Sequence, residues 1–160
     1  MRIVLHAVGR MKQGPEREMV ARYLERAQGT GKPLGLTGFD VHEITESRAG
    51  SAPARKAEEA RALVGAIGEA VIVTLDERGK ALTSETFAAE IGRWRDGGKP
   101  AVAFVIGGAD GLEQEFSRSA SLTLSFSPLT WPHQLVRIML AEQLYRATTI
   151  LAGHPYHRGN

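Results

Sequence analysis

Short apolar runs and longer segments with helical spacing alternate along this chain. The apolar runs, which are rich in β-branched residues, predict buried strands over residues 2–8, 38–44, 71–75, 101–106 and 122–125. Such nearly continuous runs are typical of strands that are covered on both faces, as in a parallel sheet. We expect the third strand to end in a turn that Asp76 opens and that contains Gly79.

Segments with helical spacing fill the gaps between these strands. Apolar residues three and four positions apart, together with good helix formers, predict helices over residues 15–28, 51–67, 84–94 and 132–151. Gly29, Gly31 and Pro33 are expected to stop the first helix, and Thr83 or Ser84 to cap the third. Strands that alternate with helices predict an α/β fold with helices on a mostly parallel sheet.

The amino-acid composition limits the classes of protein to which this chain can belong. The chain has 160 residues, 42% of them hydrophobic, so we expect a single domain over residues 1–160 with one sizeable core. It has no cysteine and no H-E-x-x-H motif, so disulfides, thiolate chemistry and a metal site are not expected. No apolar stretch reaches the roughly 18 residues of a membrane span, and we expect a cytoplasmic location. The net charge of +2 permits contact with nucleic acid without establishing it.

The glycine-rich turn at residues 107–111, directly after the fourth strand, is a candidate ligand site. Glycine lets a backbone approach a ligand closely, and ligands of α/β sheets bind beyond the carboxyl ends of the strands. Leu75 and Asp76 end another strand at the same edge, so we expect them to converge with this turn. The glycine spacing matches neither a dinucleotide fingerprint nor a P-loop, and a plain tight turn is the alternative.

The segment from Ser127 to His133 combines two prolines with large apolar residues, which is unusual for a surface loop. A stiff loop of this kind preorganises backbone N–H and C=O groups that are suited to holding an adenine edge. The alternative is a loop that packs against the core, in which Thr130 caps the final helix.

The final helix is apolar on nearly every side, which indicates burial all round. Its free face is expected to meet another copy of the chain, and burial within the monomer is the alternative. Glu142 and Arg146 lie four residues apart on this helix, so their side chains are neighbours. The two form either a structural ion pair or part of a reactive site at an interface.

The carboxyl-terminal tail, residues 154–158, contains two imidazoles, a phenol and a guanidinium. A solvated terminus is the simplest interpretation. The composition also suits chemistry: His157 as a base or donor, Tyr156 stacked on a nucleobase, and Arg158 bound to phosphate or to developing negative charge. His6 and His42, in contrast, lie in predicted strands and are interpreted as core or edge residues.

Five segments taken together resemble one protein family in order and spacing over nearly the whole chain. They are the first strand with Gly9, I-V-T-L-D at 72–76, F-V-I-G-G-A-D-G-L at 104–112, L-T-W-P-H-Q-L-V-R-I-M-L-A-E-Q-L-Y-R-A at 129–147 and H-P-Y-H-R at 154–158. The chain resembles the ribosomal RNA large subunit methyltransferase H family of the SPOUT class. Two departures are small: Trp131 replaces a smaller apolar residue, and Gly159 and Asn160 extend past the expected end.

This resemblance implies an α/β fold with a carboxyl-terminal trefoil knot, a homodimer, and S-adenosylmethionine bound in the knot loops. Knots are rare exceptions to the usual rules of topology. The implied cofactor contacts are Leu75, Gly108, Ser127, Pro128, Leu129, Thr130, Trp131 and Pro132. The implied catalytic residues are Glu142, His157 and Arg158, and the implied substrate contacts are His133, Arg137, Arg146, His154 and Tyr156.

The resemblance also implies a reaction, methylation of N3 of a pseudouridine in the helix 69 loop of 23S ribosomal RNA within the assembled ribosome. This imide-like nitrogen must lose its proton before it attacks the methyl group. His157 or Glu142 is expected to take that proton, while Arg158 stabilises the anion. The alternative function is a catalytically silent ribosome-binding protein that keeps the fold.

Overall fold

The computed structural model describes the backbone of residues 1–158 and the side chains of residues 1–156. Its centre is a five-stranded sheet with the strand order β2-β1-β4-β3-β5, in which every neighbouring pair is parallel. The strands are β1 (Arg2–Val8), β2 (Thr37–Ile44), β3 (Val71–Ala81), β4 (Ala101–Ile106) and β5 (Leu122–Ser125). The predicted parallel α/β fold is confirmed.

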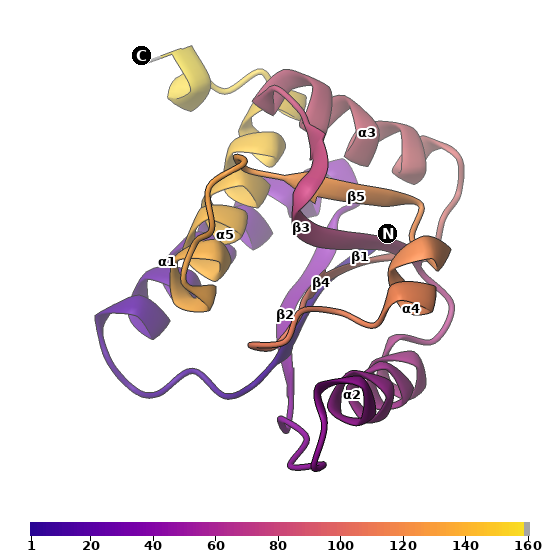
Figure 1. The fold of residues 1–160 in the computed structure, drawn as a ribbon. Coiled ribbons are helices and arrows are strands. Elements are labelled where there is room, and N and C mark those ends of the chain that lie inside the picture. The colour runs from indigo at the N-terminus through magenta and orange to yellow at the C-terminus, as the bar shows by residue number, and fades with distance from the viewer. Residues whose placement is uncertain (159–160) are drawn as a thin grey trace.

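Helices cover both faces of this sheet (Figure 1). The helices are α1 (Pro15–Gly31), α2 (Ala52–Ile67), α3 (Ser84–Asp96), α4 (Gln114–Ser119) and α5 (His133–Leu151), with short 3-10 helices η1 (Lys32–Leu34) and η2 (Pro155–Arg158). Helices α1, α3 and α5 lie on one face, and α2 and α4 on the other. None of the helices in residues 1–158 combines the length and apolarity that crossing a bilayer requires.

Alternating residues of the central strands supply the two layers of the core. Ile3, Leu5 and Phe104 face the layer that α1, α3 and α5 cover. Val8 and Val105 face the smaller layer, where they pack with Leu63 of α2 and Phe116 of α4. Because both faces of the central strands are buried, their sequences are apolar without interruption, as expected for a parallel sheet.

Helix α1 is longer than predicted. It continues through Gly29 and ends at Gly31, where an added Cβ would come within 3.1 Å of the Phe39 ring. Gly31 therefore permits close packing of the end of α1 against β2. The chain turns instead after η1, where Gly35 adopts a left-handed conformation with φ 75°.

The prediction that the third strand ends at Leu75 was wrong. Strand β3 continues to Ala81 after an irregularity in its pairing with β5 between Leu75 and Lys80. Gly79 makes this close pairing possible, since an added Cβ would lie only 2.6 Å from the carbonyl oxygen of Thr123. Asp76 therefore lies within β3 at the start of this irregularity, where its Oδ1 accepts a hydrogen bond of 2.8 Å from the Arg78 N–H.

Helix α4 was not predicted, because six residues contain too few periodic positions to reveal a helix. Its cap is local: the Glu113 carboxylate accepts a hydrogen bond of 2.7 Å from the Phe116 N–H. The helix buries Phe116 in the smaller core layer.

His6 makes the fold sensitive to acid. Its side chain is 2% exposed, its Nδ1 has no hydrogen-bond partner, and its ring centroid lies 5.3 Å from that of His42. Burial, assisted by the charge of His42, lowers the pKa of His6 to about 4. The interpretation of His6 as a core residue is confirmed.

We expect the free energy of unfolding to fall as the pH drops from 6.5 towards 4. In this range His6 binds a proton in the unfolded chain and stays neutral in the native state. The contribution of His6 to this loss between pH 7 and pH 5 is about 2 kcal/mol. Urea unfolding of the wild type and of His6→Leu at both pH values measures it. The variant should lose less stability on acidification, and an equal loss in both proteins would contradict the assignment.

Candidate functional site

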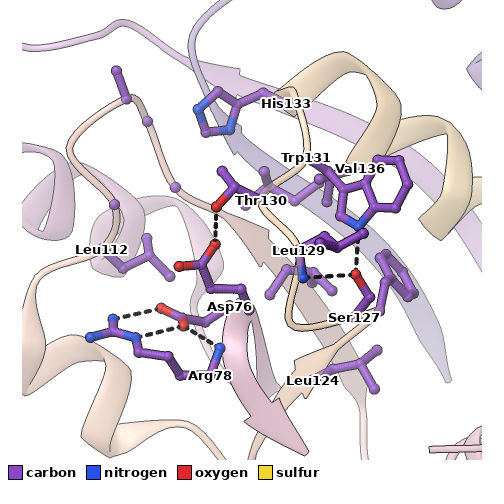
Figure 2. Close-up of a pocket in the computed structure, with 18 of the residues that line it drawn as sticks. Asp76, Arg78, Leu112, Leu124, Ser127, Leu129, Thr130, Trp131, His133 and Val136 are labelled. Carbon is purple, nitrogen blue, oxygen red and sulfur yellow. Dashed lines mark hydrogen bonds and ion pairs between the residues drawn. The ribbon is translucent and has the colours of Figure 1, made fainter. Parts of the chain in front are cut away.

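A cavity of about 380 Å³ opens at the carboxyl edge of the sheet (Figure 2). Segments that are far apart in the sequence form its walls. The lining comes from residues 75–78 of β3, residues 106–112 at and after the end of β4, His133 and Val136 of α5, and, around the end of β5, Leu124, Phe126, Ser127, Leu129, Thr130 and Trp131. The volume falls within the range of about 300–1,000 Å³ that is usual for small-molecule sites. The predicted convergence of Leu75, Asp76 and the glycine-rich turn is confirmed.

The glycine-rich turn brings bare backbone to this cavity. The Gly111 N–H donates a hydrogen bond of 2.9 Å to the Gly108 carbonyl, and Gly111 has a φ of 80°. An added Cβ on Gly107 would lie 2.9 Å from Leu112 Cγ and 3.0 Å from the Gly111 carbonyl carbon. One on Gly108 would lie 3.0 Å from Val8 Cγ1. The turn therefore has no room for a side chain at Gly107 or Gly108.

An ion pair that the sequence did not suggest anchors this turn to α2. Arg55 donates to both carboxylate oxygens of Asp110, with distances of 2.6 Å from Nε and 3.1 Å from the terminal nitrogen. Its other terminal nitrogen donates to the Ala49 carbonyl. The hydrogen bonds from Arg55 hold the pKa of the Asp110 carboxyl below its ordinary value. The turn, α2 and the loop before α2 are thus held together beside the cavity.

The loop between β5 and α5 is fixed by its own side chains, as Figure 2 shows. Ser127 Oγ accepts hydrogen bonds of 3.0 Å from both the Leu129 N–H and the Trp131 indole N–H. Thr130 Oγ1 donates to the Glu77 carboxylate at 2.6 Å, which ties the loop to β3. The alternative in which Thr130 caps α5 was wrong, since Pro132 occupies the cap position without a side-chain hydrogen bond.

A second cavity, of about 440 Å³, adjoins the first and shares Leu124 and Phe126 with it. Glu142 of α5 lines this second cavity. Its Oε1 accepts hydrogen bonds from Arg146 at 2.6 Å and from the Tyr156 hydroxyl at 3.3 Å, and its Oε2 accepts one from Gln143 at 2.8 Å. Both carboxylate oxygens of Glu142 are therefore occupied by donors from its own chain.

Tyr156 carries the start of the tail back onto α5. Its ring centroid lies 4.5 Å from that of Tyr145 and 5.1 Å from the Arg146 guanidinium carbon. Burial, followed by the negative charge of Glu142, raises the pKa of the Tyr156 hydroxyl. The tail up to Tyr156 is therefore packed against the helix, in contrast to a freely solvated terminus.

Comparison with known families decides the class of this site. A family model described as a predicted SPOUT methyltransferase matches residues 1–157. The chain belongs to the SPOUT methyltransferase family. Relatives named ribosomal RNA large subunit methyltransferase H are 60% identical in Rhodopseudomonas palustris strain TIE-1 and 58% identical in Bradyrhizobium sp. strain BTAi1. Each alignment covers 99% of this chain and 99% of the relative.

Solved structures of other methyltransferases show a more distant likeness. A putative methyltransferase from Legionella pneumophila with bound SAM has 17% sequence identity and a TM-score of 0.47, covering 92% of this chain and 66% of its own. The SpoU methyltransferase AviRb from Streptomyces viridochromogenes, in complex with AdoMet, has 13% identity and a TM-score of 0.42. That alignment covers 96% of this chain and 58% of AviRb.

The residues expected to bind the cofactor of this SPOUT protein mostly lie on the first cavity. Leu75 and Gly108 line it, as do Ser127, Leu129, Thr130 and Trp131. Pro128 and Pro132 lie between these residues and hold the loop in shape without lining the cavity. His133, expected to contact substrate, also lines the cavity at the start of α5.

Arg137, another expected substrate contact, is 5% exposed and lies away from both cavities. It forms a 2.6 Å ion pair with Glu43 and donates at 2.6 Å to the Gly9 carbonyl. Burial raises the pKa of Glu43, but hydrogen bonds from the Met11 N–H and from Arg137 outweigh this effect and hold the pKa below its ordinary value. Arg137 therefore fastens α5 to the ends of β1 and β2, and its guanidinium has no open path to an RNA.

The tail residues are partly described. His154 is exposed, and its Nδ1 accepts a hydrogen bond of 3.2 Å from the Tyr156 N–H. His157 and Arg158 belong to η2 by their backbone, and their side chains lie outside the described part of the chain. Among the side chains of residues 1–156, no group of three or more His, Asp or Glu is arranged to hold a metal ion.

Proposed function

We propose that this protein transfers a methyl group from S-adenosylmethionine to N3 of a pseudouridine in the helix 69 loop of 23S ribosomal RNA, on the assembled ribosome in the cytoplasm. One observation carries the proposal: six of the residues that the family resemblance assigned to one cofactor line a single cavity, namely Leu75, Gly108, Ser127, Leu129, Thr130 and Trp131. The relatives with the name ribosomal RNA large subunit methyltransferase H support the choice of substrate.

The first cavity has the properties that this cofactor requires. Gly107 and Gly108 leave no room for a Cβ, which would meet Leu112 or Val8, so the turn presents backbone to the cavity. The loop with Ser127 and Leu129 is held by its own hydrogen bonds before any ligand enters. Leu75, Leu124 and Ile106 give it an apolar wall for the adenine ring. The bound cofactor supplies an electrophilic methyl group, and these residues orient it.

The proton on N3 must be removed by a residue of this chain. Glu142 is a poor base, because Arg146, Gln143 and Tyr156 already donate to its two oxygens. We therefore assign the base to His157, whose ordinary pKa near 6.5 suits proton transfer at neutral pH. Glu142, Arg146 and Tyr156 position the tail, while His154 and His133 contact the RNA. Arg158 stabilises the negative charge that the pseudouridine ring carries after N3 has lost its proton.

Within one chain the tail meets α5 away from the first cavity. Tyr156 donates to Glu142, which lies nine positions along the helix from His133, or about 14 Å at the rise of an α-helix. Two copies related by a twofold axis, with their α5 helices antiparallel, would bring the tail of one chain to the cavity of the other. We accordingly propose a single-domain homodimer with a trefoil knot at its cofactor loops, in which each active site uses both chains.

Mass mapping of 23S ribosomal RNA tests this function. RNA from cells that lack the gene should be missing one methyl group, at a single pseudouridine in helix 69, and purified protein with S-adenosylmethionine should restore it on intact ribosomes. Ribosome binding without methyl transfer would support the silent binding protein instead. A methyl group restored at a different nucleotide would contradict the proposed target.

A further inference from the structure

A third hollow lies beside the cofactor cavity, on the face of the sheet that α2 and α4 cover. Its volume is about 610 Å³, and it shares Asp76, Arg78 and Leu112 with the first cavity. We call it the basic groove and define it by the residues that line it: Lys56, Asp76, Arg78, Leu112, Gln114, Ser117, Arg118, Ala120 and Thr123. A ligand in this groove would run directly into the cofactor cavity.

The groove carries an excess of positive charge. Three of its side chains are cations, Lys56 from α2, Arg78 from β3 and Arg118 from α4, while Asp76 is its one carboxylate. Asp76 is already neutralised by Arg78, whose hydrogen bonds at 2.9 Å hold the pKa of Asp76 below its ordinary value. Arg78 itself remains 85% exposed.

Lys56 and Arg118 are the free charges of the groove. Neither forms a hydrogen bond or an ion pair with any residue in the described part of the chain. Lys56 does act at a distance on Asp110, where it adds to the larger effect of Arg55 in lowering the pKa of that carboxyl. Two cations without bonded partners, on elements that face each other across a groove, favour an anionic ligand from outside.

The side chains that line the basic groove also indicate which kind of anion it can bind. The groove contains no aromatic side chain among its described residues, so it offers no platform on which a nucleobase would stack. Flexible cations without stacking partners are suited to binding phosphate oxygens. Such contacts position a nucleic acid without recognising its sequence. The groove adjoins the cofactor cavity at Asp76, Arg78 and Leu112, which line both.

We infer that the basic groove binds the phosphate backbone of the ribosomal RNA strand next to the target nucleotide, through Lys56 and Arg118. This inference rests on the proposed function, since it names the path of the same substrate. Backbone contacts here would hold the RNA in register while its base enters the cofactor cavity. They supply affinity that depends on salt and leave the choice of nucleotide to the cavity itself.

The test compares two double variants with the same loss of charge. Lys56→Gln/Arg118→Gln removes both free cations of the groove, and Lys32→Gln/Lys99→Gln removes two exposed cations near the amino ends of β2 and β4, at the opposite edge. Binding to 70S ribosomes is measured by sedimentation over a range of salt concentrations, without cofactor. The groove variant should bind about tenfold more weakly at low salt, and its slope of log affinity against log salt should be shallower by about 1.4.

Three further results decide the inference. Lys56→Arg/Arg118→Lys should restore both affinity and slope, because only the charge is required, and S-adenosylmethionine binding should be the same in all variants. Equal ribosome affinity and slope in the two Gln variants would overturn the inference, as would groove-dependent binding to anionic phospholipid vesicles and not to ribosomes. A wild type that binds ribosomes through the groove but transfers no methyl group would contradict the proposed function alone.

Discussion

Replacing Arg158 with alanine should reduce methyl transfer by about 10²–10³-fold, because the anion that forms on the pseudouridine ring then loses its charged hydrogen-bond donor. The folded state should be preserved, since the chain is packed onto α5 only as far as Tyr156 among the described side chains. The rate is measured as transfer of labelled methyl groups to ribosomes from cells that lack the gene.

The control for this variant is Arg158→Lys, which keeps the charge and loses the paired geometry of the guanidinium, and which should retain part of the activity. Thermal unfolding and equilibrium dialysis with S-adenosylmethionine should give the wild-type values for both variants. Loss of folding in Arg158→Ala would show that the tail is structural. Full activity would remove Arg158 from the active site.

Gly107→Ala should weaken S-adenosylmethionine binding by at least about tenfold, the scale at which one displaced backbone hydrogen bond and a steric clash act together. The added methyl group would lie 2.9 Å from Leu112 Cγ and 3.0 Å from the Gly111 carbonyl carbon, so the turn must shift. Gly107 is buried, and the shift would be transmitted to the backbone that faces the cavity. Isothermal titration with the cofactor measures the effect.

A matched control exists in α2. Gly65→Ala makes the same chemical change where an added Cβ meets nothing within 4 Å, so cofactor binding should be unchanged and the helix slightly more stable. If both variants bound the cofactor as tightly as the wild type, the glycine-rich turn would not be part of the cofactor site. Circular dichroism of Gly107→Ala separates a shifted turn from an unfolded chain.

The sequence was most informative where a local pattern controls the structure. The apolar runs of β1 and β4 located the centre of the sheet, because strands buried on both faces leave an unbroken apolar signal. The cap of α3 was predicted at Thr83 or Ser84 for the same reason, and Thr83 supplies it by accepting a hydrogen bond from the Thr86 N–H three residues later. The resemblance to a known family supplied the assignment of the loop at residues 127–132.

Contacts between distant segments escaped prediction. Arg55 and Asp110 are 55 positions apart, and Arg137 and Glu43 are 94 apart. No local sequence pattern around these residues therefore indicates their partners. The continuation of β3 past Leu75 depends on pairing with β5, in which Ser125 Oγ donates to the Glu77 carbonyl. These residues look like ordinary turn or helix residues until the sheet brings them together.

The proposed mechanism requires that each active site combines the cavity of one chain with the tail of another. A mixed dimer of Gly107→Ala and Arg158→Ala tests it, purified with two different tags and assayed at a cofactor concentration that the Gly107→Ala cavity does not bind. The mixed dimer has one intact cavity facing one intact tail if the sites are shared, and should regain about half of the wild-type activity. A mixed dimer that forms and stays as inactive as its two parents would show that each site lies within a single chain.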